Sequence, residues 1–228
     1  MSLRVRERLG FADVMTLLNA SVGVVAMAAA VVGRPTLVAQ LILLAAVADG
    51  LDGIIARWRG GTPVGPYLDS MADIVSFGTA TGLFVFAVAR DEWGSLVDDP
   101  ELFVLAVGAA SVFVVFSLVR TALYTVYVGE DENRPGIQNT LASSILAAAY
   151  LAGVTSIPVL LAATVVLSLA MVAPVAYPKL AARDALVMGT VQMGAIVAPT
   201  AFNSVFPRVL LVAALAYMVL APRYYWSG

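Results

Sequence analysis

The chain has 228 residues, of which 61% are hydrophobic and only 12% charged, and its mean hydropathy is +0.93. A water-soluble domain of this size is far more polar, so the composition indicates an integral membrane protein whose natural partner is the lipid bilayer. The formal net charge of −2 gives no reason to expect a nucleic-acid partner. The chain contains no cysteine and no histidine, which excludes disulfides, thiol chemistry and the usual zinc ligands. Any chemistry must therefore use carboxylates, hydroxyls, amides and arginine.

Apolar stretches recur from one end of the chain to the other and predict an all-α, polytopic membrane bundle. We expect a single membrane domain over residues 1–228, with the first apolar stretch retained as a helix, because no small-residue cleavage site follows it. Turn signals such as "GRP", "RGGTPVGP" and "NRPG" separate the stretches. The predicted spans, about eight in number, cover residues 12–32, 36–56, 67–90, 102–127, 139–155, 157–175, 183–201 and 205–222.

The basic residues predict the orientation of these spans. If the N-terminus lies in the cytoplasm, most arginines and the lysine fall on the inner side, and Arg34, Arg90 and Arg208 fall outside. This distribution follows the positive-inside rule. We therefore expect a multi-pass protein of the cell membrane whose 57–66 loop faces the cytoplasm.

Four aspartates flank that loop. "DGLDGIIAR" places Asp49 and Asp52 at the end of the second span, and "GPYLDSMAD" places Asp69 and Asp73 at the start of the third. Spacings of three and four residues put each pair on one helical face. Because the loop is short, the two helices should pack antiparallel, so that both acidic faces meet in one cleft.

Four carboxylates that close would repel one another unless a counter-charge binds between them. One or two divalent cations would supply it, and an oxygen-only ligand set favours Mg²⁺, Mn²⁺ or Ca²⁺ over zinc. Gly53 and Ala56 lie on the same face and leave room beside the backbone, while Arg57 supplies a positive charge suited to a phosphate. The ordinary structural explanation is that the acids terminate helices and pair with Arg57 or Arg59. It accounts poorly for four acids, two small residues and an arginine in register.

The pattern D-x2-D-G-x2-A-R-x7-G-x3-D-x3-D resembles the signature of the CDP-alcohol phosphotransferases, and every fixed position is filled. These are membrane enzymes that displace CMP from a CDP-linked donor with an alcohol. The resemblance implies that Asp49, Asp52, Asp69 and Asp73 bind two ions, Mg²⁺ or Mn²⁺. It also implies that Gly53, Ala56 and Arg57 hold the CDP moiety, that Asp73 takes the proton of the acceptor hydroxyl, and that the protein forms a homodimer.

Two further segments resemble the phosphatidylserine synthases of the bacterial and archaeal membrane type. They are "LDSMADIVSFG" in the third span and "MTLLNASVG" in the first. Thr16 and Asn19 of the latter would face the cleft near the nucleotide, together with Asp13, although interhelical hydrogen bonding explains the two polar residues equally well. The resemblance implies transfer of a phosphatidyl-type group from CDP-diacylglycerol or CDP-archaeol to L-serine.

Some positions depart from that subfamily. Thr81, Gln138 and Thr140 stand where it has prolines, and Leu123 stands where it has a second arginine in the fourth span. Arg120 matches the first of those arginines and is the candidate ligand of the serine carboxylate, although it could instead snorkel to the interface or pair with an acid.

Two alternatives stay open. Within the family, the acceptor could be glycerol phosphate or an inositol phosphate, but few basic residues surround the cleft. Outside it, intramembrane acids also occur in cation transporters, where they lie near mid-membrane and often on inverted repeats. Neither feature is visible here.

Overall fold

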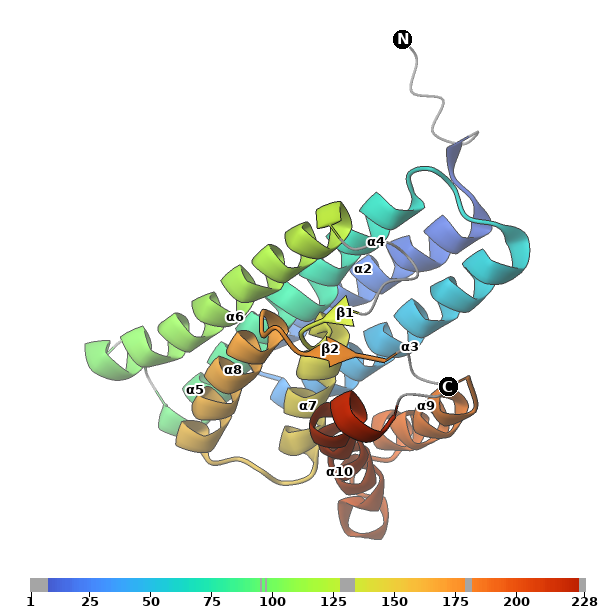
Figure 1. Cartoon of the computed structure of the whole chain (residues 1–228). Coiled ribbons are helices and arrows are strands. Elements are labelled where there is room, and N and C mark those ends of the chain that lie inside the picture. The colour runs from blue at the N-terminus through green and yellow to red at the C-terminus, as the bar shows by residue number, and fades with distance from the viewer. Residues whose placement is uncertain (1–7, 95, 97, 128–133, 179–181, 226–228) are drawn as a thin grey trace.

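The computed structural model describes residues 8–94, 96, 98–127, 134–178 and 182–225, and most of them are helical (Figure 1). Two short strands form an antiparallel pair. In chain order the elements are α2 (Phe11–Val31), α3 (Pro35–Arg59), α4 (Gly65–Asp73), the π-helix η1 (Ile74–Thr79), α5 (Ala80–Trp93), α6 (Pro100–Tyr127), β1 (Arg134–Pro135), α7 (Asn139–Leu151), α8 (Ile157–Met171), β2 (Ala176–Tyr177), α9 (Ala182–Val197) and α10 (Ala201–Tyr224).

Helical structure occupies every predicted span, which confirms the all-α polytopic fold. Within the described residues, five stretches are long and apolar enough to cross a bilayer, and the third of them is formed by α4, η1 and α5 together. The remaining helices α7, α8 and α9 have 13, 15 and 16 residues. At about 1.5 Å per residue they are shorter than a hydrocarbon core of roughly 30 Å. The long apolar helices establish an integral membrane protein.

The α2–α3 hairpin closes the end of the bundle that lies opposite the acids. Gly33 makes the turn with φ +71°, a conformation that costs glycine little because it has no Cβ. The guanidinium of Arg90 donates to the carbonyl oxygens of Ala30 (3.1 Å) and Val31 (3.4 Å). This contact satisfies carbonyls that the end of α2 leaves without intrahelical partners.

The core fills the space between α2, α3, α5, α6, α7 and α8 with large side chains from most of these helices. Ile42, Phe84, Phe113, Leu146 and Met171 are all under 2% exposed. In contrast, side chains on the outer faces of α2, α6 and α10 are apolar and exposed. An apolar exterior is expected of a protein whose solvent is lipid.

The third span is not a continuous α-helix, because η1 widens it immediately after Asp73. Neighbouring helices bond this segment on two sides. Ser76 Oγ donates to the carbonyl oxygen of Asn19 on α2 at 2.9 Å, and Ser143 Oγ on α7 donates to the carbonyl oxygen of Phe77 at 2.8 Å. Single-turn π segments inside α-helices are often found at functional sites.

Glycines allow the close approach of α2 and α6 to η1. A Cβ on Gly23 would lie 2.8 Å from the Cα of Ser76, and a Cβ on Gly78 would lie 2.9 Å from Ser117 Oγ. Small residues let membrane helices approach closely. These contacts hold the segment that follows Asp73 against its neighbours.

The last two helices pack beside α3 and α7 (Figure 1). Gln40 Nε2 on α3 donates to the carbonyl oxygen of Ile196, and Gln192 Nε2 on α9 donates to that of Leu43, both at 2.7 Å. These reciprocal contacts fix α9 against α3.

Candidate active site

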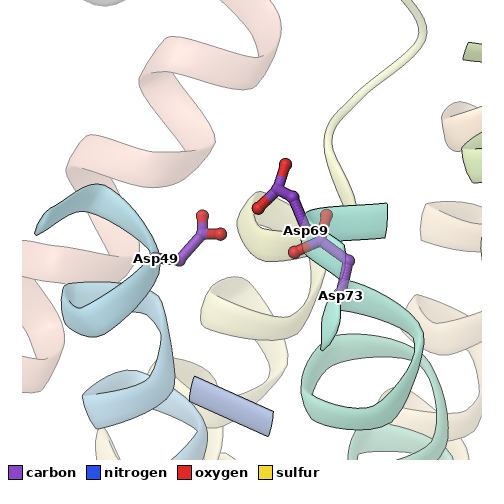
Figure 2. Close-up of side chains that lie close together, drawn as sticks. All are labelled: Asp49, Asp69 and Asp73. Carbon is purple, nitrogen blue, oxygen red and sulfur yellow. The ribbon is translucent and has the colours of Figure 1, made fainter. Parts of the chain in front are cut away.

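Three carboxylates meet where the end of α3 approaches α4 (Figure 2). Asp49 extends from α3, and Asp69 and Asp73 extend from α4 on the side that faces it. One carboxylate oxygen from each residue lies within 4.8 Å of the others. Asp49 and Asp73 are partly buried and Asp69 is exposed, so the cluster opens outward on the Asp69 side. The two helical spacings thus bring these three acids together in one place.

Asp52 lies one turn further along α3 and contacts α2. Thr16 Oγ1 donates to Asp52 Oδ2 at 2.8 Å, and Asp52 is 6% exposed. It is not one of the three closest acids, but its charge interacts with those of Asp49, Asp69 and Asp73. The four aspartates therefore form one acidic group with Asp52 on its α2 side.

The buried face of α2 carries Asp13, Thr16 and Asn19, as their spacing of three predicts. Asn19 is 0% exposed, and neither its Oδ1 nor its Nδ2 has a hydrogen-bond partner among the described residues. A buried amide without partners costs free energy unless a bound group satisfies it. This is the property expected of a ligand contact, and simple interhelical hydrogen bonding does not explain Asn19.

Hydrogen bonds to Asp13 join the α3–α4 loop to the start of α2. Its Oδ2 accepts hydrogen bonds from Gly10 N (2.7 Å) and Thr62 Oγ1 (2.8 Å), and Thr62 Oγ1 also accepts one from Gly65 N at 3.1 Å. The loop leaves α3 at Gly60, whose φ is +83°. Sequence reasoning did not single out Thr62. The available signal was a hydroxyl in a short loop otherwise built of glycine, proline and valine.

The N-terminus of α7 reaches the acid cluster from the other side. Thr140 Oγ1 donates to Asp49 Oδ2 at 3.4 Å. Thr140 is one of the positions where the related subfamily has proline, which has no hydroxyl to offer. The departure therefore adds a polar contact to an acid of the cluster, which sequence reasoning did not predict.

Arg120 and its neighbours on α6 complete the surroundings of Asp73. Arg120 is 8% exposed, its charge interacts with that of Asp73, and its Cζ lies 5.2 Å from the ring centroid of Tyr124. Thr121 Oγ1 accepts a hydrogen bond from Asn139 Nδ2 at 2.8 Å. Leu123, which stands where the related subfamily has a second arginine, is 49% exposed. Arg120 is thus oriented inward, and snorkelling does not describe it.

The residues assigned to the CDP moiety lie further along α3. Gly53 and Ala56 are partly buried, and α3 continues through Arg57, whose side chain lies outside the described part of the structure. Arg59 stacks on Phe11, with its Cζ 5.2 Å from the ring centroid. The suggestion that Arg59 serves to neutralise the acids is therefore not supported.

The donor set of this site fits a divalent cation. It consists of carboxylate oxygens, and one of them, Asp73 Oδ1, is buried without a hydrogen-bond partner in the described residues. Like charges at such separations repel by an amount on the order of a few kcal/mol per pair. A hard cation relieves that repulsion and prefers oxygen ligands.

Comparison with known proteins agrees with the resemblance noted in the motif. The sequence model of the CDP-alcohol phosphatidyltransferase family matches residues 9–223. The archaetidylserine synthase of Methanothermobacter thermautotrophicus is 26% identical over 171 residues, which is 73% of this chain and 69% of that protein. The CDP-diacylglycerol–serine O-phosphatidyltransferase of Mycobacterium leprae is 38% identical over 74 residues (32% of this chain and 25% of that protein). That of Mycobacterium tuberculosis is 35% identical over 80 residues (35% and 28%).

The mycobacterial matches span only about a quarter of those proteins, whereas the family match spans nearly all of this chain. The complete acidic motif lies within the matched residues and is assembled at one end of the bundle. The chain therefore belongs to the CDP-alcohol phosphatidyltransferase family and is a membrane transferase.

Proposed function

We propose that the protein transfers a phosphatidyl-type group from a CDP-activated lipid, CDP-diacylglycerol or CDP-archaeol, to L-serine, releasing CMP in phospholipid biosynthesis. The observation that carries this proposal is the carboxylate cluster of Asp49, Asp69 and Asp73 within a family of this chemistry. The serine acceptor is supported by the names of the relatives, an archaetidylserine synthase and serine O-phosphatidyltransferases. It is also supported by Arg120, which is buried and whose charge interacts with that of Asp73.

The proposed ligands of two metal ions, Mg²⁺ or Mn²⁺, are Asp49, Asp52, Asp69 and Asp73. When bound, such ions neutralise the pyrophosphate and stabilise CMP as a leaving group. Asp52 is held toward α2 by Thr16 and the other three acids lie together. These four residues would hold the two ions, and the exposed Asp69 would be accessible to the donor.

The nucleotide part of the donor is assigned to Gly53, Ala56 and Arg57 of α3, with Thr16 and Asn19 of α2. Gly53 and Ala56 offer an approach to the backbone, and the unpartnered amide of Asn19 offers both a donor and an acceptor. The lipid chains of the donor would remain in the bilayer beside the bundle. We place the site and the N-terminus on the cytoplasmic side, from the distribution of basic residues.

In the reaction, the serine hydroxyl oxygen attacks the lipid-linked phosphorus, the bond from that phosphorus to the bridging pyrophosphate oxygen breaks, and CMP leaves. Asp73 accepts the hydroxyl proton. Its position, partly buried and beside η1, is suited to a base held rigidly near the donor. Arg120 binds the serine carboxylate, because a buried guanidinium matches a carboxylate in a bidentate geometry.

A panel of acceptors tests the proposal. Purified full-length protein is given CDP-diacylglycerol or CDP-archaeol with Mn²⁺ or Mg²⁺, and CMP release is followed with L-serine, glycerol 3-phosphate or inositol phosphate. We expect release with L-serine. Release with only a phosphorylated acceptor would replace serine by that acceptor.

We also propose a single domain and a homodimer, and cross-linking of the protein in membranes tests the latter.

A further inference from the structure

Asn139, the first residue of α7, has a buried amide that is only half satisfied. The residue is 0% exposed, and its Nδ2 donates to Thr121 Oγ1 at 2.8 Å. Its Oδ1 has no hydrogen-bond partner in the part of the chain that the structure describes. Leaving such an acceptor unpaired is unfavourable, so this oxygen is a candidate for a bound donor.

The contacts of neighbouring turns place Asn139 at the same level along the bundle as Asp73. The third span and α7 both run away from the acid-bearing end, and Ser143 on α7 bonds the carbonyl oxygen of Phe77 on η1. One turn back toward the acids from these two residues lie Asn139 and Asp73, respectively.

The other neighbours of Asn139 also belong to the site. The residue that follows it, Thr140, contacts Asp49. Its partner Thr121 follows Arg120, whose charge interacts with that of Asp73. Asn139 is therefore linked, through the next residue on α7 and through Thr121 on α6, to residues that interact with Asp49 and Asp73.

An acceptor oxygen next to acids and a guanidinium favours a ligand group that donates hydrogen bonds. A carbonyl oxygen accepts hydrogen bonds and cannot bind a carboxylate, whereas an ammonium group has three donors to offer. We propose that Asn139 Oδ1 binds the ammonium group of the acceptor, so that the site selects an amino alcohol. This inference rests on the proposed function and adds a determinant of its acceptor specificity that the motif does not contain.

The test compares acceptor analogues on purified full-length protein. L-Serine is the substrate, ethanolamine is a competitor that has the ammonium but no carboxylate, and L-glycerate is a competitor that has the carboxylate but no ammonium. In Asn139→Leu, we expect the KM for L-serine and the Ki of ethanolamine to rise about 10- to 100-fold, the loss typical of a hydrogen bond to a charged group. The Ki of L-glycerate and the KM for the CDP-lipid should stay within about twofold.

Further variants separate binding from folding. Asn139→Asp keeps an oxygen acceptor for the ammonium group, so its KM for L-serine should rise less than that of Asn139→Leu. Thr121→Val removes the partner that orients the amide, so it should weaken the binding of L-serine but not that of L-glycerate. This variant provides the test if Asn139→Leu does not fold. The control is Thr164→Val on α8, whose buried hydroxyl donates to the Leu160 carbonyl oxygen of its own helix. It should leave all constants unchanged.

Three results would overturn the inference. They are an unchanged KM for L-serine in Asn139→Leu, an equal loss for all three compounds, or a loss for L-glycerate alone. The last would mean that the amide nitrogen binds the carboxylate. If the wild-type protein does not use L-serine, both the proposed function and the role of Asn139 fail. If the wild type uses L-serine and the variants do not change its KM, only the role of Asn139 fails.

Discussion

Thr16 Oγ1 donates a hydrogen bond of 2.8 Å to Asp52 Oδ2, which joins the first membrane helix to the acidic group on the second. The two residues are 36 positions apart in the sequence, and both are buried. The contact fixes the orientation of the Asp52 carboxylate. An acid that must hold a metal ion or a nucleotide benefits from such a fixed orientation.

Removal of that hydroxyl should therefore weaken donor binding. In Thr16→Val we expect the KM for the CDP-lipid to rise about tenfold, since a hydrogen bond to a charged group is worth about 1.5–3 kcal/mol. Thr16→Ser keeps the hydroxyl and serves as the matched control. The measurement is the rate of CMP release as a function of CDP-lipid concentration. Equal KM values for wild type and Thr16→Val would show that Asp52 needs no such support.

The acids of the cluster should differ in what their loss does. Asp49→Asn removes a proposed ligand charge, so the affinities for metal and for the CDP-lipid should fall together. Asp73→Asn removes the proposed base, so turnover should fall by about 10²- to 10⁴-fold while binding changes much less. Titration with Mn²⁺ and binding of the CDP-lipid, measured beside turnover, separate the two effects. If both variants lose binding to the same extent, Asp73 acts only as a ligand.

The spacing of the acids in the sequence predicted much of this site. Other polar contacts of the site could not be predicted from the sequence. Asp49, Asp69 and Asp73 meet because helical periodicity puts Asp69 and Asp73 on one face and a short loop joins their helix to that of Asp49, while α2 packs against both helices. Apolar length likewise predicted where the helices lie, although α7, α8 and α9 are shorter than the membrane spans expected there. Such patterns are local, and a local pattern can be read from one sequence.

Thr62 and Thr140 could not be found in that way. Their hydroxyls contact Asp13 and Asp49, residues 49 and 91 positions away. Which hydroxyl reaches which acid depends on how α7 and the α3–α4 loop pack, and no periodicity encodes that. The π-helix η1 could not be predicted for the same reason, because the hydrogen bonds made by Ser76 and Ser143 join it to other helices.

The close approach of α2 to η1 should make Gly23 sensitive to substitution. Gly23→Ala places a Cβ 2.8 Å from the Cα of Ser76, which must shift the backbone, and we expect a loss of about 1–3 kcal/mol in the free energy of unfolding. Gly108→Ala on α6 is the control, because a Cβ there meets nothing within 4 Å. Thermal unfolding in detergent compares the two. A melting temperature for Gly23→Ala no lower than that of Gly108→Ala would contradict the packing of α2 on η1.

Arg120 should matter for the acceptor and not for the donor. Arg120→Lys keeps the charge but loses the bidentate geometry, so the KM for L-serine should rise while the KM for the CDP-lipid stays nearly unchanged. Steady-state kinetics with each substrate varied in turn measures both. A variant that loses CDP-lipid binding instead would place Arg120 at the donor.

The most direct test of the account is metal-dependent incorporation of labelled L-serine into lipid. Purified protein with CDP-diacylglycerol or CDP-archaeol should form a labelled serine lipid and CMP in equal amounts with Mg²⁺ or Mn²⁺. EDTA should abolish both products, and added metal should restore them, because the carboxylate cluster needs a counter-charge to bind the pyrophosphate. Full activity in the chelator would contradict the metal site. CMP release without labelled lipid would contradict the serine acceptor.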